Sequence, residues 1–260
     1  MLPYPHIDPI AVRLGPLAVH WYGLAYVAAF LVGQKVMTWV CKRHPAFDVA
    51  LLDKLFLGVV IGVVLGGRLG YVLFYNPGFY FANPLEAFKV WQGGMSYHGG
   101  MLGVFTAILY VAWQEKIHYF DITDRLAPAV PVGLFFGRMA NFINGELFGK
   151  VTHVPWAMVF PLGGPLPRHP SQLYEAGLEG VLLFIVLITV ARVRVKRFEL
   201  SGLFMLGYGL CRFMVEFVRE PDPIPHLHHG IFTVISMGQL LSLPMVFIGL
   251  GLLWVSYAKR

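Results

Sequence analysis

Apolar residues along this chain gather into seven long stretches, which polar or charged segments separate. Each stretch approaches the ~20 consecutive apolar residues that an α-helix needs to cross the hydrocarbon core of a bilayer. The pattern therefore predicts an all-α integral membrane protein with about seven transmembrane helices. The predicted helices cover approximately residues 19–40, 50–75, 98–114, 123–141, 172–191, 202–218 and 232–257.

The fourth stretch is the least regular, because Asp124, Arg125, Pro128 and Pro131 interrupt its apolar pattern. No internal repeat or low-complexity tract is visible, so residues 1–260 are predicted to form a single polytopic membrane domain. The N-terminal residues carry no basic segment before an apolar run and no small-residue cleavage site after one. We therefore expect no secretory signal peptide there.

Composition agrees with a membrane protein, since 57% of the residues are hydrophobic and 13% are charged. Soluble domains carry roughly 25% charged residues. Twelve of the twenty Lys and Arg residues fall in the segments on one side of the predicted helices, and five fall on the other. This bias predicts an outside N-terminus, an inside C-terminus and extracytoplasmic loops at 76–97 and 142–171. It also accounts for the net charge of +6 without a nucleic-acid partner.

The three remaining basic residues, Arg68, Arg138 and Arg212, lie within or at the edge of apolar stretches. A charged side chain inside a bilayer costs several kcal/mol, so each of these arginines is a candidate functional residue. Arg68 and Arg138 also allow a plainer interpretation, in which their side chains extend to the outer headgroups. Arg212 lies too far within its stretch for this interpretation to be the natural one.

Four polar residues line one face of the sixth predicted helix at positions i, i+4, i+8 and i+11, namely Tyr208, Arg212, Glu216 and Arg219. One interpretation is that Arg212 and Glu216 only neutralise each other as an i, i+4 pair. Such a pair would leave much of the five-donor guanidinium without partners in a dry site. The other interpretation is that an anionic ligand supplies those partners.

Further polar groups lie on the predicted extracytoplasmic side. His98 stands between two glycine pairs before the third helix, and His169 precedes Ser171, the predicted N-cap of the fifth helix. Asn83 and Pro84 predict the start of a short helix through Trp91, lying in the outer membrane interface.

Other features of the sequence have structural interpretations. A glycine every fourth residue, from Gly58 to Gly70, predicts close packing of the second helix against a neighbour. The histidine-rich segment 226–229 follows a proline-rich loop without a nearby cysteine, so we do not expect a metal site there. Cys41 and Cys211 fall at different depths in the membrane, and we expect no disulfide.

The segment GRMANFINGELFG at 137–149 resembles the signature of the bacterial prolipoprotein diacylglyceryl transferases. The resemblance extends to HWYGL at 20–24, GGRLGY at 66–71, SYHGG at 96–100, HPSQLYE at 169–175 and RFMVEFVREPD at 212–222. Lys150 stands where family members often carry arginine.

The resemblance implies transfer of the diacylglyceryl group of phosphatidylglycerol to the lipobox cysteine of prolipoproteins, forming a thioether and releasing glycerol phosphate. It implies a multi-pass protein of the bacterial inner membrane with its active site toward the extracytoplasmic side. The implied partners are phosphatidylglycerol, lipobox peptides and membrane lipids, with no cofactor and no metal. The family's functional residues, carried over by position, are Tyr22, His98, Arg138, Asn141, Glu146, Gly149, Tyr208, Arg212 and Glu216.

Within this set we predict catalytic roles for Tyr22, His98, Glu146 and the two arginines Arg138 and Arg212. The others, with Arg68 as a weaker candidate, are predicted to bind or position substrate. A transporter or binder of an anionic lipid is the alternative function, since it would also need arginines within the membrane. Two accounts of thiol activation remain open. Either His98 takes the proton as a general base, or the field of the arginines favours the thiolate and His98 only binds the headgroup.

Overall fold

The computed structural model describes residues 2–15, 17–220 and 236–258, in two compact units. The first unit comprises Met1–Val40 with Asp124–Arg260, and the second comprises Cys41–Thr123. Each unit is described by itself, and the single domain expected from the sequence stays a prediction.

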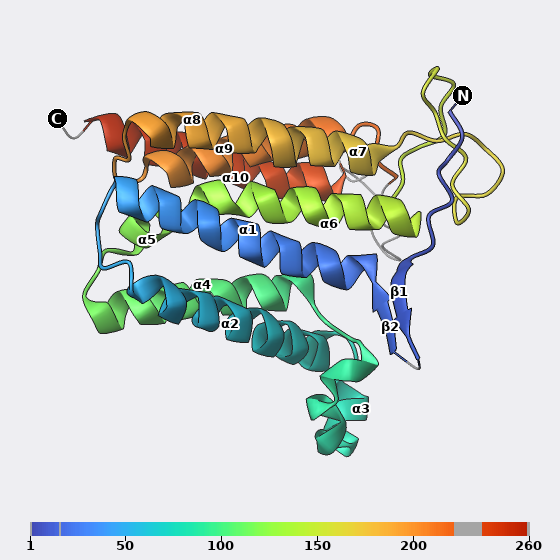
Figure 1. Ribbon diagram of the computed structural model, residues 1–260, viewed down its shortest axis with the longest axis horizontal. Helices are drawn as coiled ribbons and strands as arrows, with labels where there is room; N and C mark the ends of the chain where they lie inside the picture. Colours follow the sequence, from blue (N-terminus) through green and yellow to red (C-terminus); the bar gives the residue numbers. More distant parts are fainter. Residues whose placement is uncertain (1, 16, 221–235, 259–260) are drawn as a thin grey trace. The chain divides into compact units, whose positions relative to one another are not determined.

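Helices make up most of the first unit (Figure 1). Helix α6 packs against α7 and the π-helical segment η4, while α9 packs against α8 and α10. Because η4 continues directly from α7 and into α8, these three elements form one long helical segment. The helices of this unit are α1 (Trp21–Arg43), α6 (Val130–Asn144), α7 (Ser171–Glu175), η4 (Ala176–Leu182), α8 (Leu183–Val193), α9 (Glu199–Val215) and α10 (Met237–Ala258).

A β-hairpin precedes α1 and departs from the all-helical prediction. Strand β1 (Ile10–Leu14) pairs antiparallel with β2 (Leu17–His20), and Val12 lies opposite Val19. Gly15 lies in the turn with a φ of +60°, a left-handed conformation that glycine adopts readily. The β-branched residues Ile10 and Val12 of β1 and Val19 of β2 favour the extended conformation.

Five helical segments are long and apolar enough to cross a membrane within the described part of the chain. The helical membrane-protein prediction is therefore confirmed, while a total of seven spans stays a prediction. The stretches predicted at 98–114 and 202–218 form helices α4 (Tyr97–Glu115) and α9. The five candidate spans are Trp21–Arg43, Leu51–Phe74, Tyr119–Asn144, Ser171–Val193 and Met237–Ala258.

The irregular fourth stretch forms a continuous helical segment of three parts. Helix α5 (Tyr119–Leu126) is followed by the 3-10 turn η3 (Ala127–Ala129) and then by α6. The tighter turn lies where Pro128 and Pro131 interrupt the sequence, because proline has no N–H to donate to the preceding helical turn.

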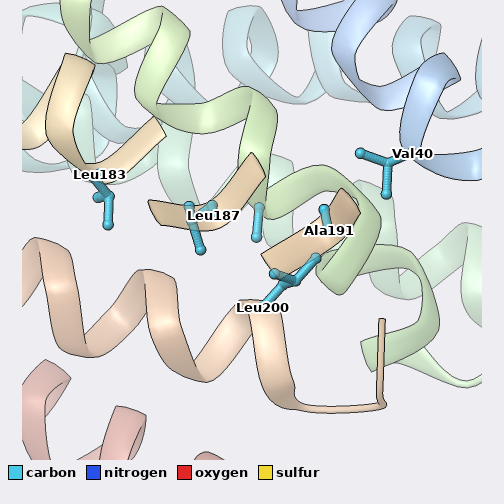
Figure 2. Packing of buried hydrophobic residues seen from close by; sticks show 6 residues of the cluster. Val40, Leu183, Leu187, Ala191 and Leu200 are labelled. Carbon is cyan, nitrogen blue, oxygen red and sulfur yellow. The ribbon is translucent and has the colours of Figure 1, made fainter. Parts of the chain in front are cut away.

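Buried apolar side chains lock α8 against its neighbours at one end of the first unit (Figure 2). Leu183, Leu187 and Ala191 repeat every fourth residue along α8 and therefore share one face. They pack with Leu200 of α9 and Val40 of α1. This core fixes α9, the helix that carries Arg212, against the segment that leads into α8.

Asp124 sets the start of α9. Its side chain is fully buried, and its two oxygens accept hydrogen bonds from the backbone N–H groups of Phe198 (2.7 Å) and Ser201 (2.7 Å). A carboxylate at this position satisfies free N–H groups and favours the positive end of the helix dipole. The polar residue that interrupts the fourth stretch thus caps a helix.

The second unit contains α2 (Leu51–Phe74), α3 (Pro77–Ala82), the 3-10 turns η1 (Pro84–Phe88) and η2 (Val90–Gln92), and α4. Helices α2 and α4 pack along their lengths. A β-carbon on Gly66 would lie 2.3 Å from the Gly99 carbonyl oxygen, and one on Gly62 would lie 2.5 Å from that of Gly103. The predicted glycine packing face is confirmed, and glycines of the SYHGG segment form its partner surface.

We expect Gly66→Ala to destabilise the second unit, because the added methyl group meets a backbone carbonyl that cannot rotate away. Overpacking of this kind costs about 1–3 kcal/mol, which a lower thermal-unfolding midpoint in detergent would show. Gly58→Ala is the matched control, since its β-carbon would lie 3.7 Å from Ala107 Cβ, an ordinary contact. Equal midpoints for both variants would contradict this account of the helix pair.

The predicted interfacial helix at 83–91 consists of two short 3-10 turns instead of one α-helix. Asn83 does not cap it through its side chain, because the Asn83 amide donates to the Phe79 carbonyl at 3.1 Å. Pro84 occupies the first turn as expected. The side chains of Phe81, Leu85, Phe88 and Trp91 are exposed.

Candidate active site

The signature segment begins on α6 and leaves the helix through two left-handed residues. Gly145 ends α6 with a φ of +69°, and Leu147 follows with a φ of +57°. The side chain of Glu146 between them accepts hydrogen bonds from the amides of Asn141 (2.9 Å) and Asn144 (3.2 Å). Glu146 therefore orients the two asparagines of the signature.

An aromatic cluster holds the same end of α6. The Tyr4 hydroxyl donates to the carbonyls of Phe142 (2.7 Å) and Ile143 (3.0 Å), and burial raises the pKa of Tyr4. The rings of Tyr4, Phe142 and Phe160 pack together in one buried core. The phenylalanine that follows Asn141 thus anchors the signature to the N-terminal segment.

Arg138 and Arg212 lie on different helices, α6 and α9, and meet at one carboxylate oxygen. Glu175 Oε2 lies 2.6 Å from Arg138 Nε and 3.2 Å from Arg212 Nη1. Glu216 Oε2 lies 2.9 Å from Arg212 Nη2. The structure therefore brings together the two arginines that the sequence singled out.

Two further charged residues complete this cluster. Glu179 lies 3.9 Å from both Arg138 and Arg212, and Arg219 lies 3.8 Å from Glu175 and 3.7 Å from Glu216. Three arginines thus face three glutamates. The fork of Arg212 meets Glu175 as well as Glu216, so it has a second protein partner besides the i, i+4 pair that the sequence indicates.

Exposure differs between the two kinds of residue in this cluster. The side chains of Glu175 and Glu179 have no exposed surface, whereas those of Arg138 and Arg212 are 18% and 14% exposed. The carboxylates thus lie behind the guanidinium groups. An anion that approaches the cluster meets arginine N–H groups first.

The segment that carries the glutamates is also attached to the signature. Ser171 Oγ donates to the Leu147 carbonyl (3.0 Å), and Gln172 Nε2 donates to the Glu146 carbonyl (2.6 Å). The prediction that Ser171 caps the helix is wrong, because Pro170 precedes α7 without a side-chain cap. The Ser171 side chain instead attaches α7 to the signature loop.

Sequence reasoning missed Glu175 and Glu179. Gln172, Glu175 and Glu179 stand at i, i+3 and i+7, so they share one face of an otherwise apolar helix. Acidic residues within a membrane segment are functional candidates for the same reason as arginines. The spacing of these residues on one face of an apolar stretch is the signal that marks them in the sequence.

The predicted loop 142–171 is tied to the end of α9. The N–H of Gly149 donates to the His169 carbonyl (2.8 Å), and a β-carbon on Gly149 would lie 2.5 Å from the Val218 carbonyl oxygen. Lys150 Nζ donates to the Phe217 carbonyl (2.9 Å). Gly149 is therefore required by close backbone packing, in addition to any contact with substrate.

Arg168 and His169 have structural partners in this loop. Arg168 donates to the carbonyls of Gly163 (2.9 Å) and Gly149 (3.2 Å) and pairs with Glu220 (2.9 Å). His169 Nδ1 lies 3.2 Å from the Tyr174 hydroxyl, and burial lowers the pKa of this imidazole. Both residues therefore hold the loop together.

Tyr22 and Tyr208 occupy different surroundings in the first unit. Tyr22 lies within electrostatic range of Glu146 and Arg138, and it lines a cavity of about 570 Å³ together with Asn144. The Tyr22 and Tyr26 hydroxyls are 3.3 Å apart. Tyr208 stands one turn before Arg212 on α9 and stacks on Phe204.

Arg68 belongs to the second unit, where backbone carbonyls surround its side chain. Its guanidinium donates to the carbonyl oxygens of Glu86 (2.7 Å), Ala87 (2.7 Å), Gly93 (2.5 Å) and Gly94 (3.1 Å). These four bonds attach the segment 84–94 to α2. The geometry favours a packing role for Arg68, in place of the substrate-binding role for which it was the weaker candidate.

His98 also belongs to the second unit and is exposed in the first turn of α4. Ser96 caps this helix by accepting a hydrogen bond from the Gly99 N–H at 3.2 Å. The histidine-rich segment 226–229 lies outside the described residues. Within the described ranges, no group of three or more His, Cys, Asp or Glu residues is arranged to hold a metal ion.

Comparison with known proteins shows similarity over almost the whole chain. The family model described as prolipoprotein diacylglyceryl transferase matches residues 9–255. A phosphatidylglycerol–prolipoprotein diacylglyceryl transferase from Paramagnetospirillum magneticum is 53% identical, over 97% of this chain and 94% of the relative. Relatives of the same name from Methylococcus capsulatus and Vibrio vulnificus are 49% and 52% identical. Those alignments cover 100% and 99% of this chain, and 99% and 94% of the relatives.

Proposed function

The chain belongs to the prolipoprotein diacylglyceryl transferase family, and from this premise we propose how its residues carry out the reaction. The enzyme transfers the diacylglyceryl group of phosphatidylglycerol to a prolipoprotein, as the names of its relatives state. The acceptor is the cysteine thiol of the lipobox.

The chemistry of this transfer decides what the site must supply. The thiol sulfur forms a bond to the glyceryl carbon that carries the phosphate, and the bond between that carbon and the phosphate oxygen breaks. The thiol proton passes to a base. The released glycerol phosphate takes the bonding electrons, so negative charge grows on its oxygen during the reaction. A site poor in water must meet that charge with fixed N–H groups.

Arg138 and Arg212 are the groups that meet this charge. The supporting observation is that both guanidinium groups converge on one oxygen of Glu175 while each stays partly exposed. Two forks held side by side can bind several oxygens of one phosphate group. The phosphate of phosphatidylglycerol therefore lies against the exposed edges of these arginines.

The neighbouring residues position this pair and the substrates. Glu216 holds Arg212 from its own helix, and Glu146 orients Asn141 toward the signature loop. Three further residues lie around the substrates and help to position them, namely Tyr22, Tyr208 and Gly149. His98 accepts the thiol proton, a role that rests on the family's motif.

We test the function with detergent-solubilised protein, phosphatidylglycerol and a synthetic lipobox peptide. Mass spectrometry is expected to show the mass of one diacylglyceryl group added to the peptide. The same peptide with its cysteine replaced by serine is the control and is expected to stay unmodified. Failure to modify the cysteine peptide with folded protein would contradict the proposal.

Placement in the membrane is the second part of the proposal. We propose seven spans in the bacterial inner membrane, with an outside N-terminus and an inside C-terminus. The bias of Lys and Arg supports this orientation. The loops 76–97 and 142–171 then lie outside, together with the active site. The exposed apolar side chains of 81–91 rest in the outer leaflet interface.

Cysteine labelling tests this orientation. In a background with Cys41→Ala and Cys211→Ala, a membrane-impermeant maleimide added from outside should modify Leu162→Cys, whose parent side chain is 71% exposed. The same reagent should miss Arg197→Cys, also at an exposed position, until the membrane is opened. A reversed pattern would contradict both the orientation and the side assigned to the active site.

A further inference from the structure

The strongest unassigned feature of the first unit is the buried carboxylate of Glu175. We propose that Glu175 is a positioning residue that fixes the distance and relative orientation of the Arg138 and Arg212 guanidinium groups. This inference rests on the proposed role of the two arginines in binding the lipid phosphate. Glu175 is the group that keeps the two guanidinium groups at a fixed distance and orientation when no substrate is bound.

The contacts of Glu175 carry the proposal. A single oxygen, Oε2, receives Arg138 Nε at 2.6 Å and Arg212 Nη1 at 3.2 Å. Its other oxygen, Oε1, lies 3.8 Å from Arg219 Nε. Glu216 makes a close contact with Arg212 and a longer one with Arg219. Among the described residues, Glu175 is the acidic residue in close contact with both proposed phosphate-binding arginines.

The neighbouring backbone explains why Glu175 is held firmly. Glu175 lies at the end of α7, and the π-helical turns of η4 follow it directly. A β-carbon on Gly180 would lie 2.8 Å from Phe135 Cβ, so the absence of a side chain there lets η4 approach α6 closely. Phe135 stands one turn before Arg138 on α6. At the other end, Ser171 and Gln172 fasten α7 to the signature loop.

A comparison of Glu175 with Glu179 distinguishes the effect of close contact with the arginines from the effect of a nearby carboxyl group. Glu179 is also fully buried, but its nearest approach to Arg138 and to Arg212 is 3.9 Å in each case. Replacement of either residue by glutamine removes one carboxyl group from the same cluster. Removal of Glu175 alone takes away the shared contact that orients both arginines. A displacement of about 1 Å at a catalytic group can lower a rate about 100-fold.

The test compares three variants by steady-state kinetics with phosphatidylglycerol and a lipobox peptide. Glu175→Gln keeps the shape and removes the charge, whereas Glu175→Asp keeps the charge and shortens the reach by one carbon. We expect both to lower kcat by about 10- to 100-fold, with a much smaller change in KM for phosphatidylglycerol. Glu179→Gln should lower kcat clearly less than either. Glu115→Gln, at an exposed pair with Lys54, should leave both constants unchanged.

Rates are taken from the monodisperse fraction after size exclusion, so that loss of folded protein is not counted as loss of activity. If Glu175→Gln does not fold, Glu175→Asp still decides, because it keeps a buried carboxylate beside the arginines. A wild-type kcat for folded Glu175→Asp would overturn the proposal, as would an equal loss in Glu179→Gln and Glu175→Gln. A wild-type protein that modifies no peptide would instead overturn the proposed function itself.

Discussion

Arg212→Lys is expected to lower diacylglyceryl transfer about 100- to 1000-fold, the range seen when one donor to a developing charge is removed. Lysine keeps the positive charge but offers a point charge in place of a planar fork. In the structure, the fork of Arg212 spans Glu175 on one nitrogen and Glu216 on the other. An ammonium group cannot keep both contacts and also face a phosphate.

The measurement is kcat/KM with phosphatidylglycerol and a lipobox peptide, on protein that elutes as the wild type does. Arg13→Lys is the matched control, because Arg13 is exposed on strand β1 and has no part in the site. We expect its activity to equal that of the wild type. Near-normal turnover by folded Arg212→Ala would show that Arg212 takes no part in the reaction. It would contradict the proposal that Arg138 and Arg212 bind the lipid phosphate.

The membrane character and the two arginines could be predicted from the sequence because each gives a local signal. Long apolar runs mark the spans, and a charge inside such a run is costly enough to stand out. Glu216 follows Arg212 at helical spacing, and the structure shows the pair at 2.9 Å. Asn141 and Glu146 come from the family signature, and their contact is known only from the structure, where α6 ends between them.

The partner of both arginines could not be found in this way. Glu175 is 37 residues from Arg138 and equally far from Arg212, so no periodicity connects them. Their contact depends on how η4 approaches α6 at Gly180, which is a property of helix packing. Arg68 shows the same limit, since backbone carbonyls are its partners and leave no trace in a pattern of side chains.

The hairpin before α1 was missed for a different reason. Its strands are five and four residues long, too short for alternation to be distinguished from the start of an apolar stretch. The Ser171 cap failed because a hydroxyl at a helix start has several backbone groups within reach. Here the Ser171 hydroxyl donates to the Leu147 carbonyl, whereas an N-cap oxygen would accept a hydrogen bond from a backbone N–H of the helix.

Activation of the thiol leads to the second large effect, a change in the pH–rate profile of His98→Gln. A free cysteine has a pKa of about 8.5, and only its thiolate attacks efficiently. A general base removes this requirement by taking the proton as the sulfur attacks. Glutamine at position 98 keeps hydrogen bonding but cannot accept that proton.

If His98 is the base, His98→Gln should show low activity at neutral pH, about 100-fold or more below the wild type. As the pH rises through 8.5 the substrate thiol ionises unaided, so the activity of the variant should recover toward the wild-type value. The measurement is kcat/KM from pH 6 to about 9.5. A peptide whose lipobox thiol has a lower pKa should shift the recovery to lower pH by the difference between the two thiol pKa values. Such a shift ties the effect to the thiol. Wild-type activity with an unshifted profile would exclude His98 as the base. The field of Arg138 and Arg212 would then be the activator.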